Sequence, residues 1–233
     1  MRRLALILGA LALLGCARGA EGPRVSPADR EAPFLYVALG DSTVEGVGAS
    51  HPDRNYVSRL HARLRERYPV ARVENLGMGG ATSADVLRRQ LDRATALAPH
   101  LITLSVGPND ITRGVPVGTY ERTMTIILES LARKTTAVVV VNLLPDLAVT
   151  RRFRDGPHQA KVGRLTVAFN DALRRVAPAH GAVLVDLYVA SQREVPRHPE
   201  LLATDGYHPS DAGYARWAEL MWEDIARRIG QGG

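Results

Sequence analysis

Ser42 stands where a strand-to-helix turn could expose a nucleophile. The apolar run 34–39 has the length and composition of a buried strand, and Gly40-Asp41-Ser42-Thr43 follows it directly. A hydroxyl just past the carboxyl end of a strand lies where open α/β sheets form their ligand-binding crevices. With a base and an oxyanion site nearby, this hydroxyl could act as a nucleophile. The alternative is a serine that only caps the following helix.

A base for this hydroxyl is available in the stretch 205–209, which reads Asp-Gly-Tyr-His-Pro. An Asp three residues before a His can reach one imidazole nitrogen and leave the other free to take a serine proton. Asp155 and His158 have the same spacing, so spacing alone does not choose between the two pairs. We prefer Asp205 and His208 because they follow the last predicted strand and directly precede the terminal helix.

Two further loops could supply hydrogen-bond donors to a developing oxyanion. The glycine-rich stretch 75–80 lets backbone N–H groups approach a substrate oxygen, and Asn109 places a side-chain amide just past a later strand. One such donor is worth roughly 3–4 kcal/mol of barrier in comparable sites. Ordinary alternatives are a structural turn for the glycines and a turn or helix cap for Asn109. A dinucleotide-binding loop is disfavoured because Thr82 stands where its third glycine belongs.

Composition argues against several other classes of function. The remaining histidines show no i, i+4 or metal-ligand spacing, and the chain has a single cysteine, so we expect no zinc site. The net charge is +6 and aromatic residues make up 5% of the chain, which does not suggest a nucleic-acid binder. We therefore expect no metal, no organic cofactor and no nucleic-acid partner.

Five predicted strands alternate with helices from Phe34 onward. The strands are expected at 34–39, 70–76, 101–106, 138–141 and 182–187. The helices are expected at about 57–68, 82–94, 120–133, 161–176 and 210–229, with longer loops at 145–160 and 195–209. This alternation predicts a single-domain, three-layer α/β sandwich around a five-stranded parallel sheet. Loops that follow parallel strands emerge on one edge of the sheet, so the four stretches described above can converge there.

The amino terminus has the pattern of an export signal. A basic pair, Arg2-Arg3, precedes a small or apolar run over 4–14 that is too short for a comfortable membrane span of roughly 20 residues. Cys16 follows Leu-Leu-Gly, which resembles the bacterial lipobox, in which the cysteine is lipidated and becomes the mature amino terminus. The alternative is a plain signal peptide cleaved near 17–19.

These features divide the chain into a signal peptide with a lipobox-like end at 1–16, a flexible linker at 17–33 and a folded domain at 34–229. The linker is assigned because 17–33 has three prolines and no apolar periodicity. We expect the protein to be exported. A membrane-anchored lipoprotein, periplasmic or on the cell surface, is the first expectation, and a secreted soluble form is the alternative.

Together, the four stretches resemble the SGNH hydrolases, also called GDSL esterases and lipases. Gly-Asp-Ser-Thr at 40–43 matches the first block of that family, and the glycine-rich stretch at 75–80 matches the second. Gly-x-Asn-Asp at 107–110 and Asp-x-x-His-Pro at 205–209 match the later blocks. The four blocks occur in the family's order, and the resemblance covers nearly all of the predicted domain.

The resemblance implies a catalytic triad and a fold. Ser42 would be the nucleophile, His208 the general base and then the acid, and Asp205 the carboxylate that orients the imidazole. The family's fold is a flavodoxin-like α/β/α sandwich with five parallel strands. The implied activity is hydrolysis of carboxylic esters through an acyl-enzyme, which makes the chain an exported serine esterase.

The resemblance also implies an oxyanion hole. Its donors would be the backbone N–H groups of Ser42 and Gly80 and the side chain of Asn109, with Gly79 as the alternative to Gly80. The expected substrates are esters of small molecules, lipids or acetylated sugars. Acyl-chain length and oligomeric state stay open.

Other functions remain to be weighed against a general esterase. A lysophospholipase or thioesterase is one alternative, since Arg151, Arg152 and Arg154 follow the fourth strand and could receive an anionic head group. An ordinary solvated loop also accounts for these arginines. A carbohydrate O-acetyl esterase is equally compatible with the sequence. A non-catalytic binding module on the same fold is disfavoured because all the motif residues are present.

Overall fold

The structure is a computed structural model that describes residues 33–230. The predicted signal segment with Cys16, and all of the predicted linker except Pro33, lie outside the described residues. The strands are β1 (Leu35–Gly40), β2 (Arg72–Asn75), β3 (Leu101–Ser105), β4 (Val138–Asn142) and β5 (Val183–Val185). The α-helices are α1 (Ser42–Glu45), α2 (Tyr56–Arg67), α3 (Ser83–Arg89), α4 (Leu91–Ala96), α5 (Pro108–Thr112), α6 (Val117–Lys134), α7 (Gln159–Ala179), α8 (Leu187–Glu194) and α9 (Asp211–Gly230). Short 3-10 turns are η2 (Pro52–Arg54), η3 (Leu147–Val149) and η4 (Pro199–Leu201).

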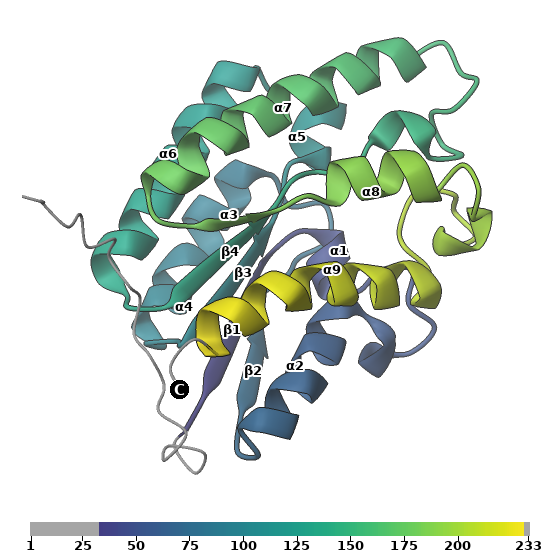
Figure 1. Cartoon of the computed structure of the whole chain (residues 1–233). Helices are drawn as coiled ribbons and strands as arrows, with labels where there is room; N and C mark the ends of the chain where they lie inside the picture. Colours follow the sequence, from purple (N-terminus) through teal and green to yellow (C-terminus); the bar gives the residue numbers. More distant parts are fainter. Residues whose placement is uncertain (1–32, 231–233) are drawn as a thin grey trace, which may run out of the picture.

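The five strands form one parallel sheet in the order β2-β1-β3-β4-β5 (Figure 1). β1 pairs on one side with β2 and on the other with β3, with Gly40 opposite Ser105 at the end of the second pairing. The predicted five-stranded α/β/α sandwich is therefore confirmed. Because all strands run in the same direction, the loops that follow β1, β2, β3 and β4 leave the same edge of the sheet.

Helices cover both faces of the sheet because alternate strand residues point to opposite sides. One face, with Val37, Ile102 and Val141, packs against apolar residues of α3, α4, α6 and α7. The other face, with Tyr36, Leu101 and Val140, packs against α2 and α9. Figure 1 shows these two helical layers on either side of the strands. The near-continuous apolar character of the central strands follows from this double covering.

The structure differs from the sequence-based prediction at Gln90 and after β5, and it adds the short helices α1 and α5. The single helix expected at 82–94 is divided at Gln90 into α3 and α4, because the Gln90 side chain turns inward to bond the backbone of Gly40. The predicted last strand ends early, at Val185, and α8 follows it. Asp186 caps α8 by accepting a hydrogen bond from Val189 N, so the helix starts immediately after β5.

Within residues 33–230, no helix has both the length and the apolar character needed to cross a membrane.

Candidate active site

A sharp turn after β1 determines where Ser42 lies. Gly40 has φ +147°, and a Cβ at this position would stand 2.0 Å from the carbonyl oxygen of Ser105, so only glycine fits beside β3. Its backbone N–H and C=O each bond the Gln90 side-chain amide at 2.8 Å. Asp41 N then donates to Ser105 O at 3.2 Å. These contacts bind the turn to the sheet, and Ser42 becomes the first residue of α1.

Asp41 is buried and caps α1. Its Oδ1 accepts hydrogen bonds from Thr43 N at 2.9 Å and Thr43 Oγ1 at 2.8 Å. Burial raises the pKa of Asp41 to about 6, although the bonds from Thr43 and the charge of His208 act in the opposite direction. The carboxyl group therefore holds the turn and points away from solvent.

Ser42, His208 and Asp205 form a continuous chain of hydrogen bonds. Ser42 Oγ lies 2.9 Å from His208 Nε2, although 166 residues separate the two in sequence. His208 Nδ1 lies 2.5 Å from Asp205 Oδ2. Burial would raise the pKa of Asp205, but its hydrogen bonds from His208 and from backbone N–H groups of Tyr207 and His208 hold the pKa below its ordinary value. This arrangement can hold a proton on Nδ1 and leave Nε2 to accept one from a hydroxyl.

The glycine-rich loop packs against the same turn. Met78 N donates to Gly40 O at 3.1 Å, and a Cβ on Gly77 would lie 2.4 Å from Glu45 N. Gly80 has φ +76°, in the left-handed region that favours glycine, and its carbonyl oxygen accepts a hydrogen bond from Arg113 Nη2 at 2.8 Å. The loop is thus fixed on one side by α1 and on the other by the end of α5.

Three polar N–H donors of this region lack an acceptor. Among residues 33–230, the backbone N–H groups of Ser42, Gly79 and Gly80 donate to no protein atom. Unpaired backbone donors near a reactive hydroxyl are the usual components of an oxyanion site. Since both Gly79 and Gly80 have a free N–H, hydrogen bonding does not choose between them.

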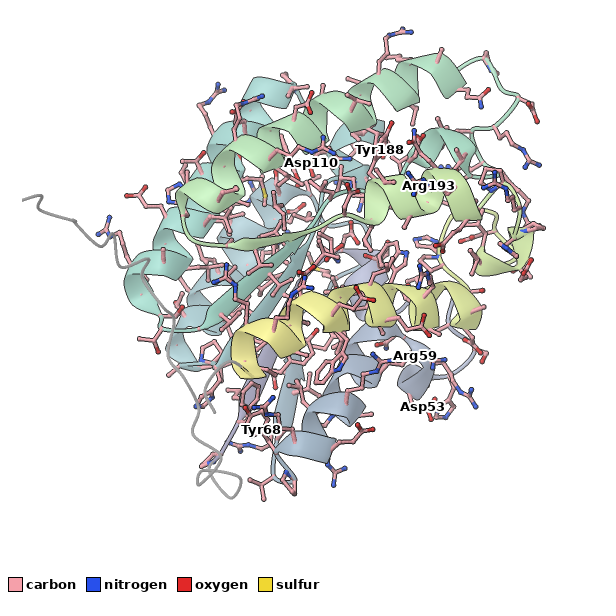
Figure 2. The ribbon with its side chains drawn as sticks, in the orientation of Figure 1. Asp53, Arg59, Tyr68, Asp110, Tyr188 and Arg193 are labelled. Carbon is pink, nitrogen blue, oxygen red and sulfur yellow. The ribbon has the colours of Figure 1, made fainter. Side chains whose placement is uncertain are left out.

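Asn109 and Asp110 join α5 to the glycine-rich loop. Asn109 Nδ2 donates to Ala81 O at 3.0 Å, which places this amide beside Gly80. Asp110 is fully buried in the interior (Figure 2), where Oδ2 accepts from Ser83 N at 2.9 Å and Oδ1 accepts from Ser83 Oγ at 2.6 Å. Burial raises the pKa of Asp110, and the bonds from Ser83 offset part of that rise. These bonds hold the loops after β2 and β3 in register.

The structure separates the predicted site residues from their alternatives. His208 is in contact with Ser42, whereas His158 is exposed at the start of α7 and makes no side-chain hydrogen bond within the described residues. Arg154 pairs with its neighbour Asp155 at 3.4 Å. Arg151 is exposed, and its Nη2 donates to the carbonyl oxygen of Ala203 at 2.6 Å.

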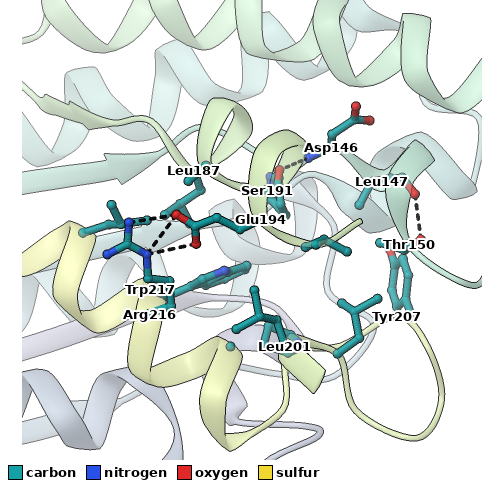
Figure 3. A pocket seen from close by; sticks show the side chains of 17 residues that line it. Asp146, Leu147, Thr150, Leu187, Ser191, Glu194, Leu201, Tyr207, Arg216 and Trp217 are labelled. Atoms are coloured by element: carbon teal, nitrogen blue, oxygen red, sulfur yellow. Dashed lines mark hydrogen bonds and ion pairs between the residues drawn. The ribbon is translucent and has the colours of Figure 1, made fainter. Parts of the chain in front are cut away.

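An apolar cavity of about 50 Å³ lies behind the loop that carries His208. Its walls come from the segment around η3 and from α8, η4 and α9, and Tyr207 and Pro209 also line it. Figure 3 shows Tyr207 on one side of this cavity and the ion pair of Glu194 with Arg216 on the other. Neither Ser42 nor His208 lines it, so the cavity is separate from the candidate catalytic side chains.

Sequence reasoning missed two residues that shape the site. Gln90 was not singled out, although a polar residue four positions after Val86 on an apolar helix face is a usable signal. Arg113 was also missed, and nothing in its sequence surroundings indicates a bond to Gly80. Among the described residues, no group of three His, Cys, Asp or Glu side chains is arranged to hold a metal ion.

Comparison with known proteins identifies the family. The model of the GDSL-like lipase/acylhydrolase family matches residues 38–216, which include all four motif stretches. The chain belongs to this family. The resemblance to SGNH hydrolases predicted from the sequence is therefore confirmed, and the chain is a carboxylic ester hydrolase, as predicted.

Named relatives of this GDSL hydrolase agree with that assignment. A lipase of Streptomyces rimosus is 33% identical over 113 residues, which are 45% of this chain and 39% of the lipase. An acetylxylan esterase of Geobacillus stearothermophilus is 26% identical over 80% of this chain and 91% of its own length. Esterase TesA of Pseudomonas aeruginosa is 26% identical over 81% of this chain and 86% of its own length. A crystal structure of TesA has the same fold, with a TM-score of 0.68 and 24% identity over 84% of this chain and 99% of that structure.

Proposed function

We propose that this GDSL hydrolase is an exported serine esterase that cleaves carboxylic esters through an acyl-enzyme formed on Ser42. The observation that supports the proposal best is the continuous hydrogen-bond chain from Ser42 Oγ through both ring nitrogens of His208 to Asp205 Oδ2. A serine activated by an imidazole, which is in turn oriented by a carboxylate, is the arrangement that acyl transfer requires.

The reaction follows from the positions of these groups. Ser42 Oγ attacks the ester carbonyl carbon while His208 Nε2 takes the hydroxyl proton, and the carbonyl electrons move to oxygen. The oxyanion accepts hydrogen bonds from the free N–H of Ser42, from that of Gly80 or Gly79, and from the Asn109 amide. As the intermediate collapses, His208 returns the proton to the departing alcohol. Water then attacks the acyl-enzyme with His208 as base, which releases the acid and restores Ser42.

A fluorophosphonate probe and three variants test this mechanism. The probe should label Ser42, and Ser42→Ala and His208→Ala should each lower turnover of p-nitrophenyl acetate by roughly 10⁴- to 10⁶-fold. His158→Ala is the matched control and should keep near-normal turnover. A protein that does not react with the probe would be a binding module. Loss of turnover in His158→Ala with retention in His208→Ala would reverse the assignment of the base.

The acetylxylan esterase relative favours acetylated carbohydrate among the candidate substrates. General hydrolysis of small esters is the first candidate activity, and carbohydrate O-acetyl esterase activity is therefore the second. Lysophospholipase or thioesterase activity is the remaining alternative. A panel of p-nitrophenyl esters from acetate to palmitate, together with acetylated xylan and a lysophospholipid, separates these possibilities. Highest kcat/KM on acetylated xylan would support the carbohydrate esterase, and highest kcat/KM on long-chain substrates would contradict it.

We also propose that the protein is exported and anchored to a membrane by lipid on Cys16. The basic pair, the short apolar run and the lipobox-like Leu-Leu-Gly-Cys support this proposal. Cells that express the full chain should incorporate radiolabelled palmitate into it, and Cys16→Ser should abolish the label. An unlabelled protein recovered from the medium would indicate a plain signal peptide instead.

A further inference from the structure

The turn that carries Asp205 and His208 is held by internal hydrogen bonds and is partly exposed, at 204 and 205. Gly206 N donates to Ala203 O at 2.9 Å, and Ala203 N donates to His208 O at 2.8 Å. Asp205 Oδ1 accepts the N–H groups of Tyr207 and His208 at 2.9 and 3.0 Å. The Asp205 side chain nevertheless remains 45% exposed. The internal bonds determine the shape of the turn, and external contacts are needed to hold the turn against α1.

Arg151 covers this turn from the loop after β4. Its Nη2 donates to Ala203 O at 2.6 Å, the same carbonyl that accepts Gly206 N. Gly206 has φ +69°, and a Cβ there would stand 2.8 Å from Arg151 Cβ and 3.1 Å from Arg151 Nε. The arginine side chain therefore lies flat on the glycine, and Gly206 is buried beneath it.

The next two residues extend the contact toward the imidazole. Arg152 N donates to Gly206 O at 3.2 Å, and its guanidinium carbon lies 5.1 Å from the centre of the Tyr207 ring. The Phe153 ring meets the same Tyr207 edge to face at 6.0 Å. Tyr207 in turn meets the His208 ring edge to face at 5.1 Å. Three consecutive residues of one loop, 151–153, thus contact the turn that holds the candidate base.

The contacts of Arg151 favour a structural use of this side chain over capture of an anion. Within residues 33–230, neither Arg151 nor Arg152 forms an ion pair with a carboxylate. The Arg151 guanidinium is directed to a backbone carbonyl, and its aliphatic stem covers Gly206. Arg154, three positions further on, pairs with Asp155, and within residues 33–230 it makes neither of these contacts.

We propose that Arg151 is a positioning residue, which clamps the Asp205–His208 turn so that the imidazole stays aligned with Ser42. This inference rests on the proposed function, because alignment matters only if His208 takes the proton of Ser42. A small displacement of the base lowers the rate of the chemical step even where substrate binding is unchanged.

Variants of Arg151 separate its two contacts. Arg151→Ala removes both the stem over Gly206 and the donor to Ala203. Arg151→Met keeps the stem and loses the donor, and Arg151→Lys keeps a stem and a cationic donor. Arg154→Ala is the matched control from the same loop. Circular dichroism shows which variants fold, and Arg151→Met and Arg151→Lys carry the test if Arg151→Ala does not fold.

Two readouts are measured on each variant. On p-nitrophenyl acetate, Arg151→Ala should lower kcat by about 10- to 100-fold with KM changed by less than about 3-fold, and Arg151→Lys should recover part of the loss. The low-field proton resonance of the His208 Nδ1–H, in the bond to Asp205, should weaken or broaden in Arg151→Ala and persist in Arg154→Ala. Unchanged kcat and resonance in Arg151→Ala, or a rise in KM alone, would overturn the clamp.

The two proposals fail in different ways. If wild-type protein does not react with the fluorophosphonate at Ser42, the assigned catalysis is wrong. The resonance still reports the clamp in that case, because it detects the bond between His208 and Asp205 without turnover. If wild-type protein reacts normally and Arg151→Ala reacts at the same rate, only the clamp is wrong.

Discussion

At the scale of single residues, Asp41 has an unusual environment beside Ser42, the proposed nucleophile. It is almost completely buried, its Oδ1 caps α1, and burial raises its pKa to about 6 from an ordinary value of 3.8. The folded state therefore binds a proton more tightly than the unfolded chain does. For such a group, stability falls as pH rises from the ordinary pKa through the raised one.

Asp41→Asn should remove this pH dependence. The amide keeps an oxygen that can accept the hydrogen bonds from Thr43 but does not titrate. In wild-type protein, ionisation of Asp41 should reduce the unfolding free energy between about pH 4 and pH 6, by at most about 3 kcal/mol for a shift of this size. Urea titrations at several pH values give the unfolding free energy of both proteins. The variant should become more stable relative to wild type as the pH rises from about 4 to about 6.

The matched control is Asp92→Asn, because the Asp92 side chain is 93% exposed. Its difference from wild type should stay nearly constant over the same pH range. A constant difference for Asp41→Asn as well would show that the carboxyl group is ionised at no cost in the folded protein.

At the scale of elements, the break between α3 and α4 supports the turn after β1. Gln90 interrupts the helix, and its amide bonds both the N–H and the C=O of Gly40. Gly40 is two residues from Ser42, so a helix on one face of the sheet determines where the hydroxyl lies. The break in the helix therefore helps to position Ser42.

Replacement of Gln90 by Leu should weaken both stability and reactivity. Leucine keeps the approximate size of the side chain but leaves Gly40 N without a partner, which costs about 1–3 kcal/mol of unfolding free energy. The rate of fluorophosphonate labelling at Ser42 should fall as well. Arg89→Ala, at the exposed neighbour, should change neither value, and equal behaviour of the two variants would contradict the role of Gln90.

Most of this arrangement was predictable because the motif residues follow strands. Ser42 and Asn109 come directly after β1 and β3, and a parallel sheet brings such positions to one edge. Contacts between distant loops that carry no recognisable motif were not predictable. The bond from Arg151 to Ala203 spans 52 residues, and neither position has a local pattern that indicates it. α8 was missed because its start depends on the cap by Asp186 more than on apolar periodicity.

At the scale of the whole molecule, stability should be graded across the sheet. β1 and β3 are buried almost throughout and have strand neighbours on both sides, whereas β2 is an edge strand with exposed residues at both ends. β5, at the other edge, has only three residues. The two hydrophobic cores meet the sheet mainly at its middle strands.

Hydrogen exchange measured by mass spectrometry should follow this gradient. Amides of β1 and β3 should exchange by global unfolding, and those of β2 and β5 should exchange about 10-fold faster or more through local opening. Peptides covering α9 should be protected nearly as well as β1, because α9 contributes a long buried face to one core. Exchange of β2 as slow as that of β3 would contradict this grading.

The contact between Ser42 and His208 joins the first strand to the segment just before the last helix. During translation, the first four strands of the sheet are complete more than 60 residues before the imidazole is added, since β4 ends at Asn142. Under the proposed mechanism, nascent chains that stop before position 208 carry most of the sheet but lack the base for Ser42. Stalled ribosome-bound chains of this length should therefore remain inert toward fluorophosphonate, whereas stalled chains with residues 34–230 outside the ribosome should react.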